Sequence, residues 1–251
     1  MNTFKLGLTP DTKDERDYVY NFWWKPKEKL PTSARIKMPK IRDQKNIGSC
    51  ASFAITTILS HFYNLKFEFS PLFVYYNARL NEFGEKGILE DSGNTLRGVL
   101  KSINKTGFCT EYSWLYKPEL FKDKPSKNAY MAGIERRNED KIYYTRALDT
   151  DAIKQGIVDG YVPYLGFTIY ENFYSKETME CGVASYPKGK ALGGHAVVIS
   201  GYDDDLFGGC FIIHNSWSEG AGHNGYFYFP YKVFEKLVND CWLVKVIPDI
   251  I

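Results

Sequence analysis

Cys50 stands at the start of a predicted helix, where a cysteine could act as a nucleophile. The apolar residues that follow recur at three- and four-residue steps: Ala51, Ala54, Ile55, Ile58, Leu59 and Phe62. This spacing predicts a helix with one broad buried face, with Ser49 or Cys50 near its N-cap. The partial positive charge of a helix N-terminus favours the thiolate, which is the nucleophilic form of cysteine. Taken alone, however, a cysteine on an apolar helix is more often an inert core residue.

Two downstream segments supply partners for such a nucleophile. Gly194-His195-Ala196-Val197 places a histidine at the start of an apolar run, and Asn215-Ser216-Trp217 ends another run. A histidine can move protons for a thiol nucleophile, and a neutral asparagine can orient the imidazole without adding charge. Each residue also has an ordinary structural explanation, so the argument depends on their occurring together and in this order.

With a cysteine, a histidine and an asparagine in this order, the chain resembles the papain (cathepsin-like) family of cysteine peptidases. The matching pieces run from residue 44 to residue 226: Gln44, Gly48-Ser49-Cys50, Phe53, the 194–197 string, Asn215-Ser216-Trp217 and Asn224-Gly225-Tyr226. The resemblance implies an α+β papain-like fold, in which a helical half and an antiparallel β-barrel-like half enclose an active-site cleft. A cleft between two halves of a protein is a favoured ligand site.

The resemblance also implies roles for individual residues. Cys50 as thiolate and His195 as imidazolium would attack a peptide carbonyl and form an acyl-enzyme. Asn215 would orient His195, and the Gln44 amide with the Cys50 N–H would form the oxyanion hole. The expected substrate-binding residues are Gly48, Ser49, Gly93, Ala196 and Trp217.

Three of these substrate-binding positions have specific expected tasks. Trp217 would shield the Asn215–His195 hydrogen bond and form a wall on the leaving-group side. Gly93 matches a family loop whose backbone pairs with an extended peptide, although a tight turn explains this glycine equally well. Ala196 would line the pocket for the second residue before the cut. The C-terminal segment near Asp240 would form the floor of that pocket.

The predicted function is peptide-bond hydrolysis, with endopeptidase action expected. Two alternatives stay open: an acyl transferase that uses the same Cys-His-Asn site, and a catalytically silent peptide-binding module. The expected partner is a peptide or protein substrate, and neither a cofactor nor a metal is expected.

Composition restricts the other function classes. The chain has 251 residues and a net charge of +2, without a basic stripe or a phosphate-binding loop, which argues against nucleic acid as a partner. Its longest apolar runs have strand length, so no membrane association is expected. Five cysteines without a C-x-x-C pair indicate neither a zinc ribbon nor a regular disulfide framework.

The same features suggest a compartment. Secreted relatives carry a disulfide-bonded cysteine three residues ahead of the nucleophile, where this chain has Ile47. Without that cysteine, and without a signal-peptide core at the N-terminus, we expect an intracellular, reducing location.

The chain reads as one peptidase domain, 1–251. The helical half is expected at roughly 45–135, and the β-rich half at roughly 136–251 together with an N-terminal strap, 1–44. Further helices are predicted from Ser70-Pro71 to Gly84, from 96 to Gly107, and from a cap at Asp151, with 117–141 as the crossing between the halves. Strands are predicted at 161–169, 196–201, 209–215, 225–230 and 242–246.

The 49 residues ahead of Cys50 are too few for the long helical propeptide of secreted relatives. We therefore expect either constitutive activity or a short N-terminal arm that covers the cleft. A strap that lies across the far half is the plainer alternative.

Overall fold

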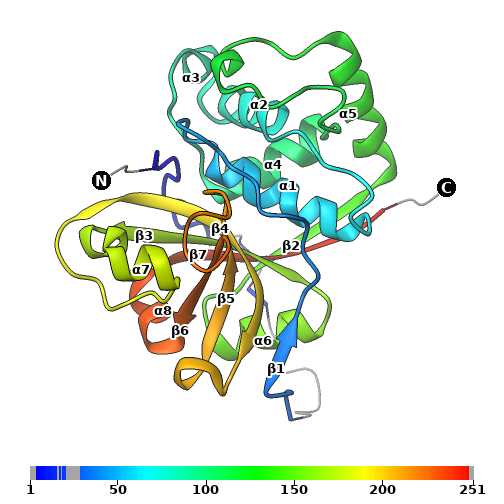
Figure 1. Ribbon diagram of the computed structural model, residues 1–251. Coiled ribbons are helices and arrows are strands. Elements are labelled where there is room, and N and C mark those ends of the chain that lie inside the picture. Colours follow the sequence, from blue (N-terminus) through cyan, green and yellow to red (C-terminus); the bar gives the residue numbers. More distant parts are fainter. Residues whose placement is uncertain (1–3, 16, 18, 21–28, 249–251) are drawn as a thin grey trace.

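A computed structural model describes residues 4–15, 17, 19–20 and 29–248. It has a helical half and a sheet half, with α1 lying between them (Figure 1). The helical half contains α1 (Cys50–Phe62), α2 (Pro71–Phe83), α3 (Glu85–Leu89), α4 (Leu96–Thr106) and α5 (Lys127–Glu139), with a short 3₁₀ turn, η2 (Pro118–Leu120). Local capping sets several of these boundaries. Ser70 and Thr95 each accept a hydrogen bond from a backbone N–H three residues on, and Gly84 and Gly107 end the same two helices with positive φ.

The sheet half is antiparallel throughout. Its strands are β1 (Ser33–Arg35), β2 (Lys141–Arg146), β3 (Val162–Tyr170), β4 (Ala191–Asp203), β5 (Cys210–His214), β6 (Tyr226–Pro230) and β7 (Val238–Ile247). Their order is β2-β7-β3-β4-β5-β6, with β1 paired to β4, so the sheet curves without closing. The remaining helices are α6 (Thr150–Val158), α7 (Lys176–Cys181) and α8 (Tyr231–Leu237), with 3₁₀ turns η3 (Glu171–Tyr174) and η4 (Leu206–Gly208). Helices with an antiparallel sheet confirm the expected α+β class.

Strand alternation divides the core between two faces of this sheet. On β4, Val197 and Ile199 belong to a cluster inside the sheet half, together with residues of α6 and α8. Ala196 and Val198 belong to a second cluster that contains the buried faces of α1 and α4. Because neighbouring side chains of a strand point to opposite faces, one strand joins both clusters. The two halves therefore share a core.

Several elements were not predicted or begin elsewhere than expected. The stretch 117–141, expected as the crossing between the halves, contains an unpredicted helix: α5 occupies Lys127–Glu139, and only Ala129 and Gly133 of it are buried. Asp149, not Asp151, caps α6, since the Asp149 carboxylate accepts from the Ala152 N–H at 2.9 Å. The edge strand β2, paired to β7, was not predicted.

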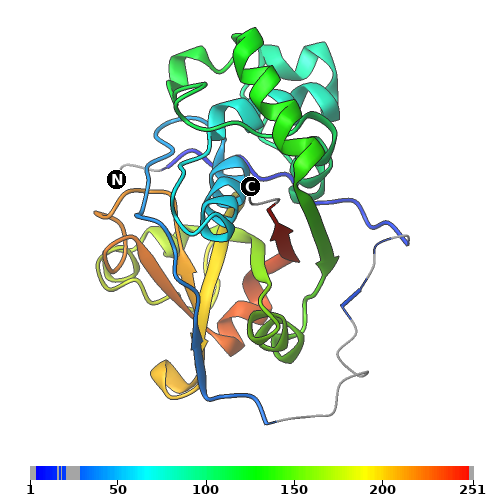
Figure 2. The ribbon, with the colours of Figure 1, turned by 90° about the vertical axis from the view of Figure 1, so that its right-hand side faces the viewer.

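The N-terminal part of the chain makes two separate crossings. Residues 4–11 lie at the junction of the two halves, whereas the stretch that includes β1 runs down the side of the sheet half (Figures 1 and 2). The N-terminal part of the chain thus contains both a segment at the junction, as expected for an arm, and a strap along the sheet half (Figures 1 and 2). Within the described ranges, no helix combines the length and the apolar character needed to cross a membrane.

Arg79 joins three segments of the helical half through hydrogen bonds. Its side chain is completely buried and donates to five backbone carbonyls: those of Tyr75, Gly87, Ile88, Glu90 and Phe121. The acceptors belong to three segments that no regular hydrogen-bond ladder joins. A single guanidinium can serve them because it has five N–H donors in a fixed plane.

Replacing Arg79 by methionine should leave these buried carbonyls without donors. Each unsatisfied buried acceptor costs about 1–3 kcal/mol, so we expect the free energy of unfolding to fall by at least about 3 kcal/mol. Chemical denaturation measures this loss. The matched control is Arg137→Met on α5, an exposed arginine that should change stability little. Equal stability of the two variants would contradict the role given to Arg79.

Candidate active site

Cys50 is the first residue of α1, directly after the N-cap Ser49. The first turn of α1 packs against β3 and β4: the Tyr164 hydroxyl donates to the Ala51 carbonyl at 2.8 Å, and the Ala196 backbone makes a hydrogen bond to the Cys50 sulfur. Because Ala196 follows His195 on β4, the sulfur lies beside the strand that carries the imidazole. Cys50 is fully buried and His195 is 1% exposed.

His195 is held from one side by Asn215 and flanked by aromatic rings. Its Nε2 lies 2.7 Å from Asn215 Oδ1, which also accepts from the Ser216 N–H at 2.8 Å. Trp217 stacks on the imidazole at a centroid distance of 4.3 Å, and the Phe167 ring meets it edge-on. The His195 Nδ1 is buried without a hydrogen-bond partner among the described residues. The ring therefore has one fixed nitrogen and one available nitrogen.

Gln44 connects the loop before α1 to the segment after β5. Its Oε1 accepts from the Ser216 hydroxyl at 2.8 Å, and its backbone N–H donates to the Ser216 carbonyl at 2.9 Å. Its Nε2 donates at 3.1 Å to two carbonyls, those of Ile47 and Lys5. The amide thus points at a backbone carbonyl that enters the site from the N-terminal segment. An oxyanion donor would act on such a carbonyl.

Residues that the sequence did not single out position this loop. The Gly48 N–H donates to the Asp91 carboxylate at 2.8 Å, and the Tyr75 hydroxyl donates to the same carboxylate. The Tyr116 hydroxyl lies 2.9 Å from that of Ser49 and donates to the Gln44 carbonyl at 2.6 Å. Neither Asp91 nor Tyr116 has a local motif that would mark it, since each acts through chain segments brought together by folding.

The described residues between 4 and 20, which we call the N-terminal arm, enter the site. The Phe4 ring stacks on Trp217, with centroids 4.5 Å apart and planes 4° from parallel. The Leu8 N–H donates to the Gly194 carbonyl at 3.1 Å, and the Gly7 carbonyl accepts from the Asn94 N–H at 2.9 Å. We call the space that Phe4–Leu8 fill, between Trp217 and Gly194, the catalytic groove.

Three glycines allow this close approach. A Cβ on Gly7 would lie 2.0 Å from the Gly48 carbonyl oxygen, and a Cβ on Gly93 would lie 1.9 Å from the Gly7 carbonyl oxygen. Gly93 also has a φ of +71°. The positive φ agrees with the tight-turn explanation of Gly93, and the Gly7 backbone passes close to it, while pairing with a substrate stays a prediction.

Burial acts against the charged form of both groups. It raises the pKa of the Cys50 thiol, and hydrogen bonds from the backbone of Ala196 and Gly7 offset this only in part. Burial also lowers the pKa of His195 to about 4, against which the hydrogen bond with Asn215 acts. The helix N-terminus works in the other direction at Cys50, since it favours the thiolate.

The other histidines and cysteines have structural places. His214 Nε2 lies 3.0 Å from the Pro39 carbonyl oxygen, and His61 Nδ1 lies 2.8 Å from that of Lys37. All five cysteines lie in the described part of the chain and are free thiols, and of these only Cys181 is exposed. Among the described residues no cluster of ligands could hold a metal ion.

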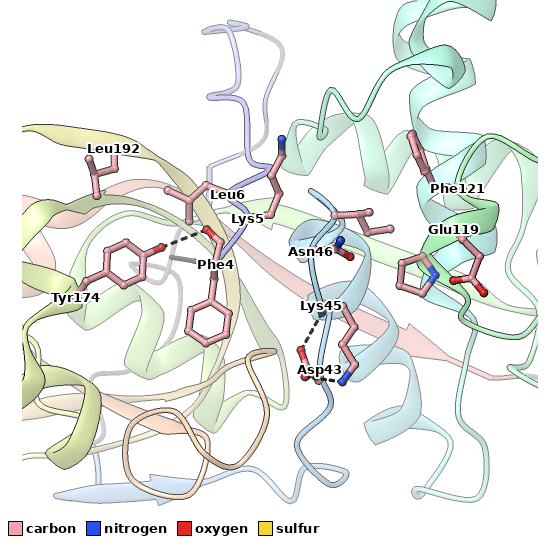
Figure 3. Close-up of a pocket in the computed structure, with 12 residues that line it drawn as sticks. Phe4, Lys5, Leu6, Asp43, Lys45, Asn46, Glu119, Phe121, Tyr174 and Leu192 are labelled. Atoms are coloured by element: carbon pink, nitrogen blue, oxygen red, sulfur yellow. Dashed lines mark hydrogen bonds and ion pairs between the residues drawn. The ribbon is translucent and has the colours of Figure 1, made fainter. Parts of the chain in front are cut away.

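An open cavity of about 1190 Å³ flanks the arm and extends over both halves (Figure 3). Phe4 and Tyr174 line one side of it, Lys45 and Asn46 lie across from them, and Phe121 lies further out. The Tyr174 hydroxyl donates to the Phe4 carbonyl at 3.4 Å. Space for a longer or bulkier peptide thus continues beyond the segment that the arm fills.

Comparison with known proteins places these features in a family. The sequence model of "Papain family cysteine protease" matches residues 26–244. A peptidase C1-like protein of Acanthamoeba polyphaga mimivirus is 32% identical, over 97% of this chain and 88% of its own length. A cathepsin B-like protein of Giardia intestinalis is 28% identical, over 81% of this chain and 67% of its own.

Solved structures agree with the sequence comparison. Xylellain, a cysteine protease from Xylella fastidiosa, superposes with a TM-score of 0.82 at 30% identity, with 98% of each chain covered. Procathepsin B from Trypanosoma congolense superposes with a TM-score of 0.72 at 16% identity, over 97% of this chain and 86% of its own, and it supports the fold alone. The expected papain-like fold is confirmed.

Replacing Gly7 by alanine should displace the arm from the catalytic groove, because the added Cβ would meet the Gly48 carbonyl. An overpacking cost of about 1–3 kcal/mol corresponds to a rise in Cys50 alkylation by iodoacetamide on the order of tenfold or more. Peptide mapping by mass spectrometry separates Cys50 from the other thiols. Thr9→Ala is the control, since the Thr9 side chain is exposed on the same arm. Unchanged alkylation in Gly7→Ala would contradict occlusion by the arm.

Burial of neutral His195 should make stability depend on pH. Its pKa of about 4 in the folded chain lies below the ordinary value of 6.5, so the unfolded chain binds the proton first and stability falls as pH drops from 6.5 towards 4. Between pH 7 and pH 5 this contributes a loss of about 2 kcal/mol. Urea denaturation at both pH values should show a loss in the wild type that exceeds the loss in His195→Gln by this amount. Equal losses would show that His195 is not held neutral.

Proposed function

We propose, from the premise that this chain belongs to the papain family of cysteine proteases, that Cys50 is the nucleophile of a peptidase and His195 its general acid and base. The observation that carries the proposal is the arrangement of the imidazole. Asn215 holds His195 Nε2, and His195 Nδ1 has no partner among the described residues. The backbone of Ala196, the residue after His195, makes a hydrogen bond to the Cys50 sulfur. A positioned base beside a thiol at a helix start is what nucleophilic catalysis requires.

The reaction would proceed in two steps once a substrate replaces the arm. The thiolate attacks the scissile carbonyl carbon and a C–S bond forms, while His195 delivers its proton to the departing amine as the C–N bond breaks. In the second step His195 takes a proton from water, whose oxygen attacks the thioester and releases the acid and the thiol. Moving the arm exposes both groups to water, which removes the desolvation that disfavours their charged forms.

Gln44 and Asn215 would prepare the site for these steps. The Gln44 Nε2, which donates to the Lys5 carbonyl in the covered state, is available to an oxyanion when a substrate carbonyl takes that place. One such donor is worth about 2.7–4 kcal/mol in transition-state stabilisation. Asn215 fixes the imidazole orientation, and the stacked Trp217 keeps water from their hydrogen bond.

The path of the arm supports endopeptidase action. Phe4 and Leu8 lie on opposite sides of the Gln44–Lys5 contact, so an extended chain continues in both directions past the site. The Gly48 and Gly93 backbones border this path, and Ala196 packs in the same cluster as Leu8. A protein substrate could therefore lie across the groove with residues on each side of the cut.

The five free thiols support a reducing environment, and Ile47 occupies the position where the secreted relatives have a disulfide cysteine. The core shared by α1 and β4 supports a single peptidase domain.

Replacing Cys50 by alanine should abolish peptide hydrolysis and leave the fold intact. The assay is cleavage of a diverse peptide library, in the wild type and in the Gly7→Ala background, read by mass spectrometry. Cys109→Ala is the matched control, because Cys109 is also a buried free thiol but lies away from the histidine. Hydrolysis that survives in Cys50→Ala, or that is lost equally in Cys109→Ala, would refute the assignment. Internal cleavage products are expected, and release of terminal residues alone would refute endopeptidase action.

A further inference from the structure

Beyond the catalytic groove, the N-terminal arm carries a carboxylate onto the start of α4. The Asp11 carboxylate accepts from the Arg97 backbone N–H at 3.2 and 3.3 Å and from the Trp242 indole N–H at 3.2 Å. The same indole N–H also donates to the Asp240 carboxylate at 3.1 Å. Arg97 is the second residue of α4, an eleven-residue helix, and first-turn N–H groups have no partner within their own helix. Asp11 thus supplies an acceptor to a first-turn N–H of α4.

A second carboxylate of the arm reaches two guanidinium groups. One Asp17 oxygen lies 2.5 Å from Arg97 Nη2 and 3.0 Å from Arg146 Nη1. Arg146 also donates from Nε to Asp240 on β7 at 2.9 Å. Both guanidiniums lie near the Trp242 ring, with their central carbons 5.7 and 5.5 Å from its centroid. The aromatic ring and the ion pairs fix the positions of both arginines.

Burial of Arg97 leaves one of its guanidinium donors without a hydrogen bond to the part of the chain that the structure describes. Arg97 is only 8% exposed, and its Nε is buried. Each guanidinium nitrogen of Arg79 donates to at least one carbonyl, whereas Arg97 Nε has no partner among the described residues. Buried polar groups are generally hydrogen-bonded, so this open donor is a reason to consider a ligand at the site.

We propose that Arg97, Arg146 and the Trp242 indole N–H form a binding site for an acidic side chain of the peptide substrate, which Asp11 and Asp17 fill in the covered state. The inference rests on the proposed function, because it takes the arm as a stand-in for a peptide that lies in the groove. It adds the substrate class: peptides with an aspartate or glutamate at a defined distance from the cut.

The charge of the site changes sign when the arm leaves. With the arm in place, three carboxylates (Asp11, Asp17 and Asp240) face two guanidiniums. Without the arm, Asp240 is the one of these three carboxylates that remains, so the two guanidiniums outnumber it. The pKa of Asp240 is raised to about 7, first by burial and then by its hydrogen bond with Asp11. A new carboxylate would restore the balance that the arm supplies.

The position of this acidic residue follows from the path of the arm. Leu8 packs in one cluster with Leu96 and Ala196, and Asp11 lies three residues further on. At about 3.3 Å per extended residue this is about 10 Å. The arm runs from Phe4 at Trp217, on the expected leaving-group side, to Leu8 at Ala196, which is opposite to the direction of a substrate. If Ala196 lines the pocket for the second residue before the cut, a substrate in that opposite direction places its acidic side chain near the fifth residue before the cut.

The test uses the full-length chain with three substitutions. Gly7→Ala displaces the arm from the catalytic groove, and Asp11→Asn with Asp17→Asn removes its two carboxylates from Arg97 and Arg146. The substrates are fluorogenic peptides that differ only in carrying Asp or Asn at the fourth, fifth or sixth residue before the cut. We expect Asp to raise kcat/KM about tenfold over Asn at one of these positions. Adding Arg97→Met should remove this preference, Arg97→Lys should retain part of it, and the exposed Arg137→Met should leave it unchanged.

Equal kcat/KM for Asp and Asn at all three positions, with hydrolysis otherwise normal, would overturn this inference and leave the proposed function standing. If no peptide is cleaved, the proposed function fails instead. In that case binding decides the inference: fluorescein-labelled versions of the same peptides are titrated against the same variant carrying Cys50→Ala. Tighter anisotropy-detected binding of the Asp peptide, weakened by Arg97→Met, would support the acidic site, and equal affinities would refute it.

Discussion

The contact between the first turn of α1 and strand β4 is the constraint on which the rest of the site depends. Cys50 starts the helix, His195 and Ala196 are neighbours on the strand, and the buried faces of both elements belong to one cluster. A one-residue slip in the pairing of β4 with β3 would turn the imidazole to the other face of the sheet, because side chains alternate along a strand. The shared core of the two halves is therefore also what sets the position of Cys50 relative to the strand that carries His195.

Steric fit, rather than charge, holds the covered state in the groove. Gly7 passes Gly48 and Gly93 at distances that leave no room for a side chain, and Phe4 continues the stack that begins with His195 and Trp217. Burial raises the pKa of Cys50 and lowers that of His195, so the covered state disfavours the charged form of both groups. Ionic contacts occur further along the arm, where Asp11 accepts from the Arg97 backbone and Asp17 pairs with the Arg97 and Arg146 side chains.

Features that depend on local chemistry could be predicted from the sequence, and those that depend on distant encounters could not. Ser70, Gly84 and Gly107 mark helix ends through their own backbone preferences, and the structure places those ends as expected. α5 was missed because only Ala129 and Gly133 of its residues are buried, which leaves almost no apolar periodicity. The candidate Cys, His and Asn could be chosen by residue type and order. Asp91 and Tyr116 could not, since each reaches the site through hydrogen bonds between segments far apart in the chain.

The arm that fills the groove is part of the chain that it blocks. An intramolecular occupant competes at an effective concentration set by its tether, which for short flexible connections is in the millimolar range. Dilution cannot remove it, and a free peptide of equal intrinsic affinity would have to reach a comparable concentration to replace it. A long substrate that also engages the arginines beyond Leu8 would gain affinity from two connected contacts, so chain length itself would help to decide which proteins enter.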